Sequence, residues 1–277
     1  MKLEGAKAAA QIKNDLSEQC KKLNQKNLDS KIVIFRLGNN PDDISYEQRI
    51  LKNCREIGLG TKVVSLAESI TQDDFIKEIT HYNKQDSVLG ILIFRPLPKH
   101  LDERIIGEAI SAEKDIDCMN PLNLKKLFLG DLTRIAPCTP EAVMELLKFY
   151  DIPLKSKHVV IVNRSMVLGK PLALLLLEED ATVTICHSKT EDLIRMTSQA
   201  DIVITGIGKP KFFGKEYFKS DATVIDVGIN FTQEGMCGDV DFESVNEYVS
   251  AITPVPGGVG TVTSMVLLKH ALRGKEK

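Results

Sequence analysis

Short apolar runs that alternate with amphipathic segments constrain the fold of this chain more than any other feature. In the first half, apolar runs at 31–37, 61–66 and 88–94 are separated by segments 42–57 and 72–82, whose apolar residues recur at helical spacing. Consecutive strands joined through helices form parallel sheets, because the chain must cross a face of the sheet between one strand and the next. The pattern therefore predicts an α/β domain with helices on both faces of a parallel sheet.

A second alternating series follows Pro140, and its order resembles a dinucleotide-binding fold. We expect strands at 158–162, 181–186, 202–205, 223–227 and 251–252, and helices at 4–28, 141–150, 167–177 and 190–200. The helical pattern after Gly260 is predicted to cross back onto the first domain. The sequence thus predicts two α/β domains, one of residues 1–139 plus 261–277 and one of residues 140–260.

Composition excludes several classes of protein. The 277 residues carry a net charge of −2 and include no tryptophan, which gives no support for binding to nucleic acid or to a membrane surface. The sequence has no apolar signal core at its start and no run of the ~18 apolar residues that a membrane span needs. Six cysteines without C-x-x-C spacing indicate a reducing compartment such as the cytoplasm, with neither a disulfide framework nor a metal site.

The loop Thr253–Gly260 (TPVPGGVG) is rigid at its start and permissive at its end. Two prolines fix the backbone of the approach, and three glycines then allow conformations or close contacts that side chains forbid. A helical pattern follows at once, and a glycine-rich turn leading into a helix is a natural cradle for a planar or anionic group. A tight connector between two packed elements is the alternative.

The turn after strand 158–162 is the candidate cofactor site. Residues 163–169 (NRSMVLG) match the G-x-G-x-x-G fingerprint poorly, since only Gly169 remains. The next strand ends in Cys186-His187-Ser188-Lys189 and lacks the acid that holds the ribose 2′-hydroxyl of NAD. Arg164, Ser165 and Lys189 instead suit the 2′-phosphate of NADP, although all three are also ordinary solvated turn residues.

Three features of the first domain are candidates for a substrate site. Tyr46 shares one helix face with Ile50 and Cys54 at 100° per residue, and such a tyrosine is also a common core residue. Segment 90–98 (GILIFRPLP) is a strand that ends in a proline-fixed loop, where open α/β sheets bind ligands. Asp117 could pair with a guanidine-like edge through two hydrogen bonds, or could cap a turn.

Together and in this order, the segments resemble the methylenetetrahydrofolate dehydrogenase/cyclohydrolase family over nearly the whole chain. The matching segments are Tyr46, 90–92 with 96–98, 114–117, 137–140, 164–165 with 169–171, 187–190, 208–210, 225–230, 238–240 and 253–260. The resemblance implies two α/β domains with a cleft between them, a homodimer, NADP as cofactor and a tetrahydrofolate derivative as substrate.

The resemblance also implies roles for individual residues. Tyr46 and Asp117 would be the catalytic residues, with Asp117 holding the pterin edge. The substrate-binding residues would be Tyr46, Phe94, Pro96, Leu97, Asp117, Pro256, Gly257 and Gly258. The cofactor-binding residues would be Asn163, Arg164, Ser165, Gly169, Lys170, Pro171, His187, Ser188, Gly206, Ile207, Gly208, Asp226, Gly228, Ile229 and Thr263.

Two departures from the family pattern affect the hydrolytic step. Bifunctional members have a lysine four residues after the tyrosine and a glutamine before Pro-Leu-Pro, whereas this chain has Ile50 and Phe94. Hydride transfer needs little acid–base help, but hydrolysis of the methenyl cation needs a titratable group. Arg49 lies near the tyrosine face but does not release a proton near neutrality, and Lys52 lies about 120° away.

We therefore expect an NADP-dependent methylenetetrahydrofolate dehydrogenase whose cyclohydrolase activity is lost or very weak, and a separate enzyme that hydrolyses the product. The alternatives are a bifunctional dehydrogenase/cyclohydrolase, a non-catalytic folate-binding regulator, and a reductase of another substrate on the same fold.

Overall fold

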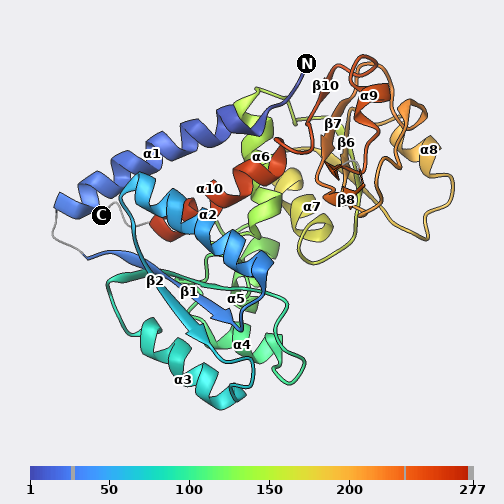
Figure 1. Ribbon diagram of the computed structural model, residues 1–277. Coiled ribbons are helices and arrows are strands. Elements are labelled where there is room, and N and C mark those ends of the chain that lie inside the picture. The colour runs from blue at the N-terminus through green and yellow to red at the C-terminus, as the bar shows by residue number, and fades with distance from the viewer. Residues whose placement is uncertain (26–28, 234, 274–277) are drawn as a thin grey trace. The chain divides into compact units, whose positions relative to one another are not determined.

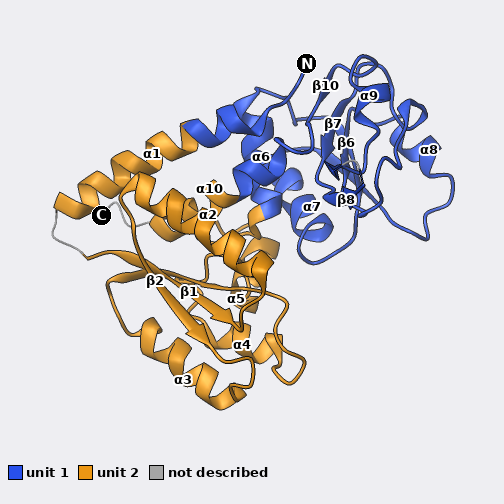
Figure 2. Ribbon diagram, in the orientation of Figure 1, with its two compact units in different colours: residues 1–10, 139–263 blue, residues 11–138, 264–277 orange. Residues whose placement is uncertain are grey.

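The computed structural model describes residues 1–25, 29–233 and 235–273, and it divides into two compact units (Figures 1 and 2). Unit 1 consists of residues 1–10 and 139–263, and unit 2 of residues 11–138 and 264–277. Residues 1–10, which the sequence-based division assigned to the other domain, join unit 1 through backbone hydrogen bonds. Leu3 donates to the carbonyl of Ile252 and Gly5 to that of Gly257, both at 2.8 Å.

The sheet of unit 2 contains three parallel strands in the order β2–β1–β3. These are β1 (Lys31–Leu37), β2 (Gly60–Leu66) and β3 (Val88–Ile93). Helices α2 (Pro41–Ile57) and α3 (Gln72–Asn83) connect them and lie on opposite faces of the sheet (Figure 1). The predicted parallel α/β arrangement is confirmed, and the fully buried β3 agrees with a strand covered on both faces.

Local signals fix the ends of α2, the helix that carries Tyr46. The side chain of Asn40 accepts a hydrogen bond from the backbone of Asp42, and Pro41 occupies the first turn, where its missing N–H costs nothing. Gly58 ends the helix in the left-handed conformation, with φ of 78°. The helix therefore has the predicted extent to within one residue.

The other helices of unit 2 in the described ranges are α1 (Gly5–Gln25, whose first residues lie in unit 1), α4 (Glu103–Ala109), α5 (Pro121–Phe128) and, from residue 264 on, α10 (Val259–Leu272), which passes from unit 1 into unit 2. The last three residues of the predicted helix 4–28 lie outside the described part of the chain. The sequence did not predict α4 and α5, because each is too short for a periodic signal. Side-chain caps from Asp102 and Asn120 define where they begin.

The sheet of unit 1 contains five parallel strands in the order β10–β7–β6–β4–β5. They are β4 (His158–Val162), β5 (Thr182–Cys186), β6 (Ile202–Thr205), β7 (Thr223–Asp226) and β10 (Ala251–Ile252). Val160, Val203, Val224 and Phe213 form the centre of a core packed against this sheet. A second, antiparallel pair consists of β8 (Asn230–Thr232) and β9 (Gly235–Cys237).

Helices α7 (Gly169–Glu178) and α8 (Leu193–Thr197) connect the first strands of this sheet. The other helical elements that contain residues of unit 1 are α6 (Cys138–Phe149), the 3₁₀ turn η1 (Lys215–Tyr217), α9 (Phe242–Val245) and α10 (Val259–Leu272). The predicted helix 190–200 was wrong in extent, since α8 begins only at residue 193. The Thr190 hydroxyl accepts the backbone N–H of His187 in a turn, and Asp192 caps α8 from a left-handed conformation.

None of the helices described within residues 1–273 is long and apolar enough to cross a membrane.

Candidate functional site

Loops that follow β4, β6 and β7 form a pocket of about 260 Å³ in unit 1. Its walls include Asn163, Ser165, Gly206, Gly208, Gly228 and Ile229. The sheet order places β5 on one side of β4 and β6 on the other, so the order in which strands are added reverses at β4. Open α/β sheets bind their ligands at such a switch point, beyond the carboxyl ends of the strands.

Asn163 organises the turn between β4 and α7. Its Oδ1 accepts hydrogen bonds from the backbone of Ser165 (2.8 Å), the hydroxyl of Ser165 (2.8 Å) and the backbone of Gly169 (3.0 Å). Its Nδ2 donates to the carbonyl of Gly206 after β6. One side chain thus joins two of the loops that line the pocket. These bonds also delay the start of α7, which the sequence predicted at residue 167.

Close contacts require glycine at one position in the pocket wall, Gly206, and at one next to it, Gly169. A Cβ on Gly169 would lie 1.9 Å from the carbonyl oxygen of Asn163, and one on Gly206 would lie 2.4 Å from the side chain of Leu168. Gly208 adopts φ of 67°, a conformation that suits glycine. Close contacts therefore require glycine at positions 169 and 206, which the weak G-x-G-x-x-G match did not indicate.

Asp239 is fully buried beneath the loop after β6. Its carboxylate accepts the backbone N–H groups of three consecutive residues, 207, 208 and 209, and the side-chain amide of Asn230. Consecutive N–H groups of this kind usually form an anion-binding nest. Here the anion is the protein's own, and it fixes the position of the Gly206–Gly208 wall.

Asp226, a predicted cofactor residue, is buried at the end of β7. Its carboxylate accepts the backbone N–H groups of Gly228 (2.9 Å), Asp239 (3.1 Å) and Val240 (2.8 Å). Burial raises the pKa of Asp226 to about 6, and Asp239 adds to the rise, while these hydrogen bonds oppose it. The structure gives Asp226 a place behind the wall of the pocket, where it fixes the turn that carries Gly228 and Ile229.

The turn after β5 contains no carboxylate from Cys186 to Thr190. His187 accepts the N–H of Lys189 through Nδ1 at 3.1 Å, and Ser188 and Lys189 are exposed. Arg164 is also exposed, and no group in the ranges 1–25, 29–233 and 235–273 pairs with its guanidinium. Unpaired cations and hydroxyls without an acid are the features expected of a site for a 2′-phosphate.

The remaining predicted residues of unit 1 occupy varied surroundings. Lys170 is exposed and Pro171 buried within α7, and the Thr263 hydroxyl donates to the carbonyl of Val259 inside α10. In the 253–260 loop, Pro256 and Gly257 are exposed, and Gly258 is buried. A Cβ on Gly258 would lie 2.5 Å from the carbonyl oxygen of Pro254, so close packing within the loop already accounts for this glycine.

Tyr46 and Phe94 pack together in unit 2, with ring centroids 5.5 Å apart. Ile50, one turn after Tyr46, is only 1% exposed and belongs to the core. Burial raises the pKa of Tyr46, and the nearby carboxylate of Asp117 raises it further, so the phenol remains protonated. The site therefore contains a neutral phenol whose ring packs against Phe94.

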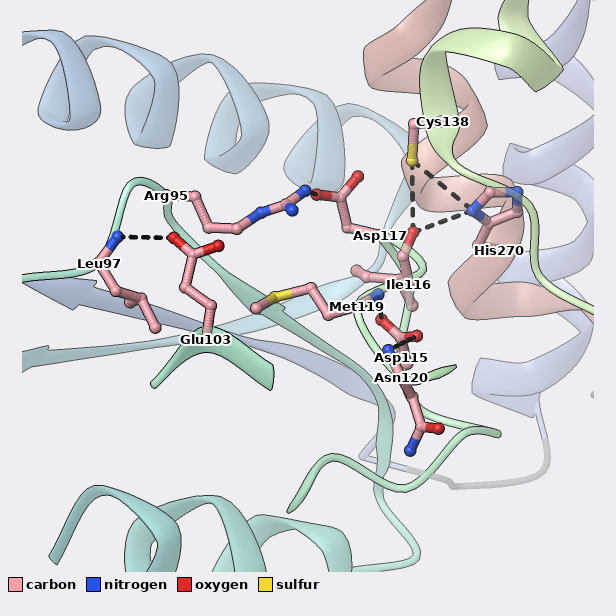
Figure 3. A network of polar contacts seen from close by, with 10 residues as sticks. All are labelled: Arg95, Leu97, Glu103, Asp115, Ile116, Asp117, Met119, Asn120, Cys138 and His270. Atoms are coloured by element: carbon pink, nitrogen blue, oxygen red, sulfur yellow. Dashed lines mark hydrogen bonds and ion pairs between the residues drawn. The ribbon is translucent and has the colours of Figure 1, made fainter. Parts of the chain in front are cut away.

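Asp117 and Asp115 have different surroundings, although they are two residues apart. Asp115 is buried and accepts hydrogen bonds from the backbone of Met119 and Asn120 and the amide of Asn123. Asp117 is partly exposed and accepts a hydrogen bond from Arg95 at 2.8 Å (Figure 3). Asp115 therefore anchors the segment, and Asp117 is presented to solvent.

The carbonyl of Ile116, between these aspartates, is held from the other side. His270 Nδ1 and Cys138 Sγ both lie within hydrogen-bond distance of its oxygen, at 2.9 and 3.3 Å (Figure 3). The loop before α4 is also fixed, since the backbone of Leu97 donates to Glu103 at 3.2 Å, while Pro96 is exposed. The backbone on either side of Asp117 is thus rigid.

Comparison with known proteins places both units in one family. Residues 3–117 match the family model described as tetrahydrofolate dehydrogenase/cyclohydrolase, catalytic domain, and residues 137–277 match the NAD(P)-binding domain of the same family. The chain belongs to the tetrahydrofolate dehydrogenase/cyclohydrolase family.

Relatives in this family match over almost their whole length. The bifunctional protein FolD of Clostridium botulinum is 54% identical over 99% of this chain and 98% of its own. The crystal structure of the bifunctional enzyme FolD from Campylobacter jejuni is 40% identical, with a TM-score of 0.96 over 99% and 97% of the two chains. A Trypanosoma brucei FolD structure in complex with NADP cofactor and inhibitor is 33% identical, with a TM-score of 0.90 over 98% and 96%.

Membership in the family does not identify Arg95, Asp239 or His270, which the sequence analysis also missed. Arg95 had a signal that could have been used, since it follows a buried strand directly and precedes the Pro-Leu-Pro turn. Asp239 lies in the matching segment 238–240, but its contacts with residues 207–209 span 30 or more residues, and the contact of His270 with Ile116 spans 154.

Proposed function

We propose that this protein oxidises 5,10-methylenetetrahydrofolate to 5,10-methenyltetrahydrofolate with NADP, and that its cyclohydrolase activity is lost or very weak. The family supports the dehydrogenase. The proposed loss of cyclohydrolase activity rests on the surroundings of Tyr46. There Ile50 is buried and Phe94 packs against the phenol ring.

The residues of the unit 1 pocket fit a dinucleotide. Backbone and small side chains around Asn163, Gly206 and Gly228 leave room for a planar group, and the exposed guanidinium of Arg164 can pair with a 2′-phosphate. The relative that is described as complexed with NADP supports the same cofactor. When bound, NADP⁺ supplies the acceptor for the hydride that leaves the methylene carbon.

The residues of unit 2 would bind and orient the folate. Asp117 is the partly exposed carboxylate of a rigid segment, and we assign it to the pterin edge, where it would accept hydrogen bonds from ring N–H groups. The hydroxyl of Tyr46 would donate a hydrogen bond to the bound folate, since the raised pKa of Tyr46 keeps the proton on the oxygen. We assign Phe94, Pro96 and Leu97 to contacts with the rest of the folate; the contact expected of residues 256–258, which belong to unit 1, stays a prediction.

Hydrolysis of the methenyl cation requires a group that takes a proton from water. Lysine can serve once burial lowers its pKa, but isoleucine has no proton to exchange. Phe94 likewise removes an amide that could orient such a group. General acid–base catalysis typically contributes about 10²–10⁴-fold, so its loss would leave hydrolysis near its uncatalysed rate.

A bifunctional enzyme is the second candidate, because relatives 53–54% identical to this chain are described as bifunctional protein FolD. In that case Arg49, Lys52 or a bound water would have to replace the lysine. A non-catalytic folate-binding regulator is a third candidate, and the ordered cofactor turn held by Asn163 argues against it. We further propose a cytoplasmic homodimer that works with a separate cyclohydrolase, and the six free cysteines support a reducing compartment.

The test compares two double variants of the Tyr46 surroundings. Ile50→Lys with Phe94→Gln restores both polar groups and is expected to accelerate the decay of methenyltetrahydrofolate relative to wild type. Ile50→Met with Phe94→Leu repacks the same positions without a polar group and is the matched control. Equal cyclohydrolase rates in wild type and the polar double variant would refute the assigned role of these positions.

A further inference from the structure

Arg95 forms an ion pair with Asp117 beside the Tyr46–Phe94 pair and has no role in the proposed function. Arg95 follows Phe94 directly, and its Nη2 donates to Oδ2 of Asp117 at 2.8 Å. The two side chains are 32% and 24% exposed, respectively. Figure 3 shows that they point toward one another from the loop after β3 and from the segment that holds Asp115.

This pair retains most of its capacity for hydrogen bonds. A guanidinium has five N–H donors and a carboxylate about four acceptor sites, and only one bond joins the two groups. Within the described ranges, neither side chain has a further partner. Donors of Arg95 and acceptors of Asp117 therefore lie side by side and remain open to a ligand.

The lactam edge of a pterin is complementary to such an arrangement. A carbonyl oxygen, which only accepts, lies beside a ring N–H and an exocyclic amino group, which only donate. We propose that Arg95 is a specificity-determining folate contact that donates to the pterin carbonyl oxygen while Asp117 accepts from the adjacent N–H groups. This inference rests on the proposed function and adds to it a residue that recognises the pterin carbonyl group.

A consequence is discrimination between two classes of pteridine. A 4-oxo pteridine presents a carbonyl acceptor to the guanidinium of Arg95. A 4-amino pteridine presents an N–H donor to the same donor group, so neither group gains a hydrogen bond. Sites that hydrogen-bond a substrate group reject analogues that lack it strongly, for the same reason. The wild type should therefore bind 4-oxo pteridines in preference to 4-amino pteridines.

The test measures dissociation constants for folic acid, its 4-amino analogue and pteroic acid by titration calorimetry. We expect wild type to prefer folic acid over the 4-amino analogue, and Arg95→Met to weaken folic acid about tenfold or more and to remove the preference. Arg95→Lys keeps the charge without the planar fork and should retain part of the preference. Arg104→Met is the control, because Arg104 is an exposed arginine of α4.

Several outcomes would overturn the inference. An unchanged preference in Arg95→Met, or equal weakening of both pteridines, would leave Arg95 as a support for Asp117 only. Weakened binding of folic acid but not of pteroic acid would place the guanidinium on the glutamate tail. Binding of neither pteridine by wild type would also overturn it, while NADPH formation from methylenetetrahydrofolate by wild type tests the proposed function separately.

Discussion

The candidate sites of the two units are built in different ways. The pocket of unit 1 is formed by loops whose backbone is held by hydrogen bonds, with glycines among its walls and two buried aspartates, Asp226 and Asp239, behind them. The site of unit 2 is formed by side chains, namely Tyr46, Phe94 and the Arg95–Asp117 pair, which project from a sheet edge and a helix. The shape of the unit 1 pocket depends on many residues at once, whereas the chemistry of the unit 2 site can change through a substitution at one position.

This difference bears on the proposed loss of the cyclohydrolase, which would leave the fold unchanged. Ile50 and Phe94 fill core-like positions without disturbing the sheet or α2, so the two substitutions are compatible with the fold. Side chains added at two glycines of unit 1 would meet close neighbours, the carbonyl of Asn163 at Gly169 and the side chain of Leu168 at Gly206. The comparison predicts large effects from conservative substitutions in unit 1 and selective effects in unit 2.

The largest effect is expected from Asp239→Asn. The substituted amide would place a donor against the N–H groups that Asp239 accepts, and each buried group left unsatisfied costs about 1–3 kcal/mol. We expect a loss of about 4 kcal/mol in the free energy of unfolding of unit 1, measured by urea denaturation, together with weaker NADP binding. Asp221→Asn, at a carboxylate that is 77% exposed, is the control and should change neither.

Gly169→Ala tests the backbone contact alone. The added Cβ would lie 1.9 Å from the carbonyl of Asn163, so the turn must shift, at a cost near the upper end of the range of about 1–3 kcal/mol for overpacking. Gly260→Ala is the matched control, because nothing lies within 4 Å of its Cβ position and alanine favours the helix. Similar denaturation midpoints for the two variants would remove the distinction between backbone-built and side-chain-built sites.

Arg164→Ala should affect the choice of cofactor and leave the fold intact. Loss of a charge-assisted contact costs about 1.5–3 kcal/mol, so kcat/KM for NADP should fall by roughly one to two decades while the value for NAD stays unchanged. Steady-state kinetics with both cofactors measure this. A wild type that prefers NAD, or an NADP value untouched by the substitution, would contradict the assignment of Arg164 to the 2′-phosphate.

The smallest effect is expected at the Asp201–Lys219 ion pair, which lies away from the pocket walls. The hydrogen bond from Lys219 lowers the pKa of Asp201 in the folded state. The ion pair therefore stabilises the fold at pH values above the unfolded-state pKa of about 3.9, and this stabilisation is lost as the pH falls through the lower pKa of the folded state. Both side chains are about 30% exposed, which limits the contribution to about 0.2–1 kcal/mol. Lys219→Met should therefore lower the urea midpoint slightly at pH 7 and not at pH 2.

The sequence predicted the elements that carry a strong periodic signal. Strands β1, β4 and β6 have the predicted bounds, and α2 ends at Gly58 as expected, because apolar runs and glycine caps act locally. The short helices α4 and α5 were missed, since seven or eight residues are too few for a periodic pattern. The predicted helix 190–200 was too long because its first residues form a hydrogen-bonded turn.

Long-range contacts explain what the sequence could not predict of the sites. Asn163 was a candidate, but its bond to the carbonyl of Gly206 spans 43 residues. Asp239 and the loop it supports are 30 or more residues apart, and no local pattern distinguishes it from a solvated aspartate. Arg95 pairs with Asp117 across 22 residues, so its role became visible only when the fold had brought the two together.

The most direct test of the central claim is a paired assay on one preparation of the wild type. NADPH formation from methylenetetrahydrofolate and the decay of authentic methenyltetrahydrofolate are followed at the same enzyme concentration, with protein-free buffer as the reference. The account predicts steady turnover in the first assay and, in the second, a rate at least about 100-fold lower, close to that of buffer. Decay of methenyltetrahydrofolate as fast as hydride transfer would contradict the claim that Ile50 and Phe94 have removed the cyclohydrolase.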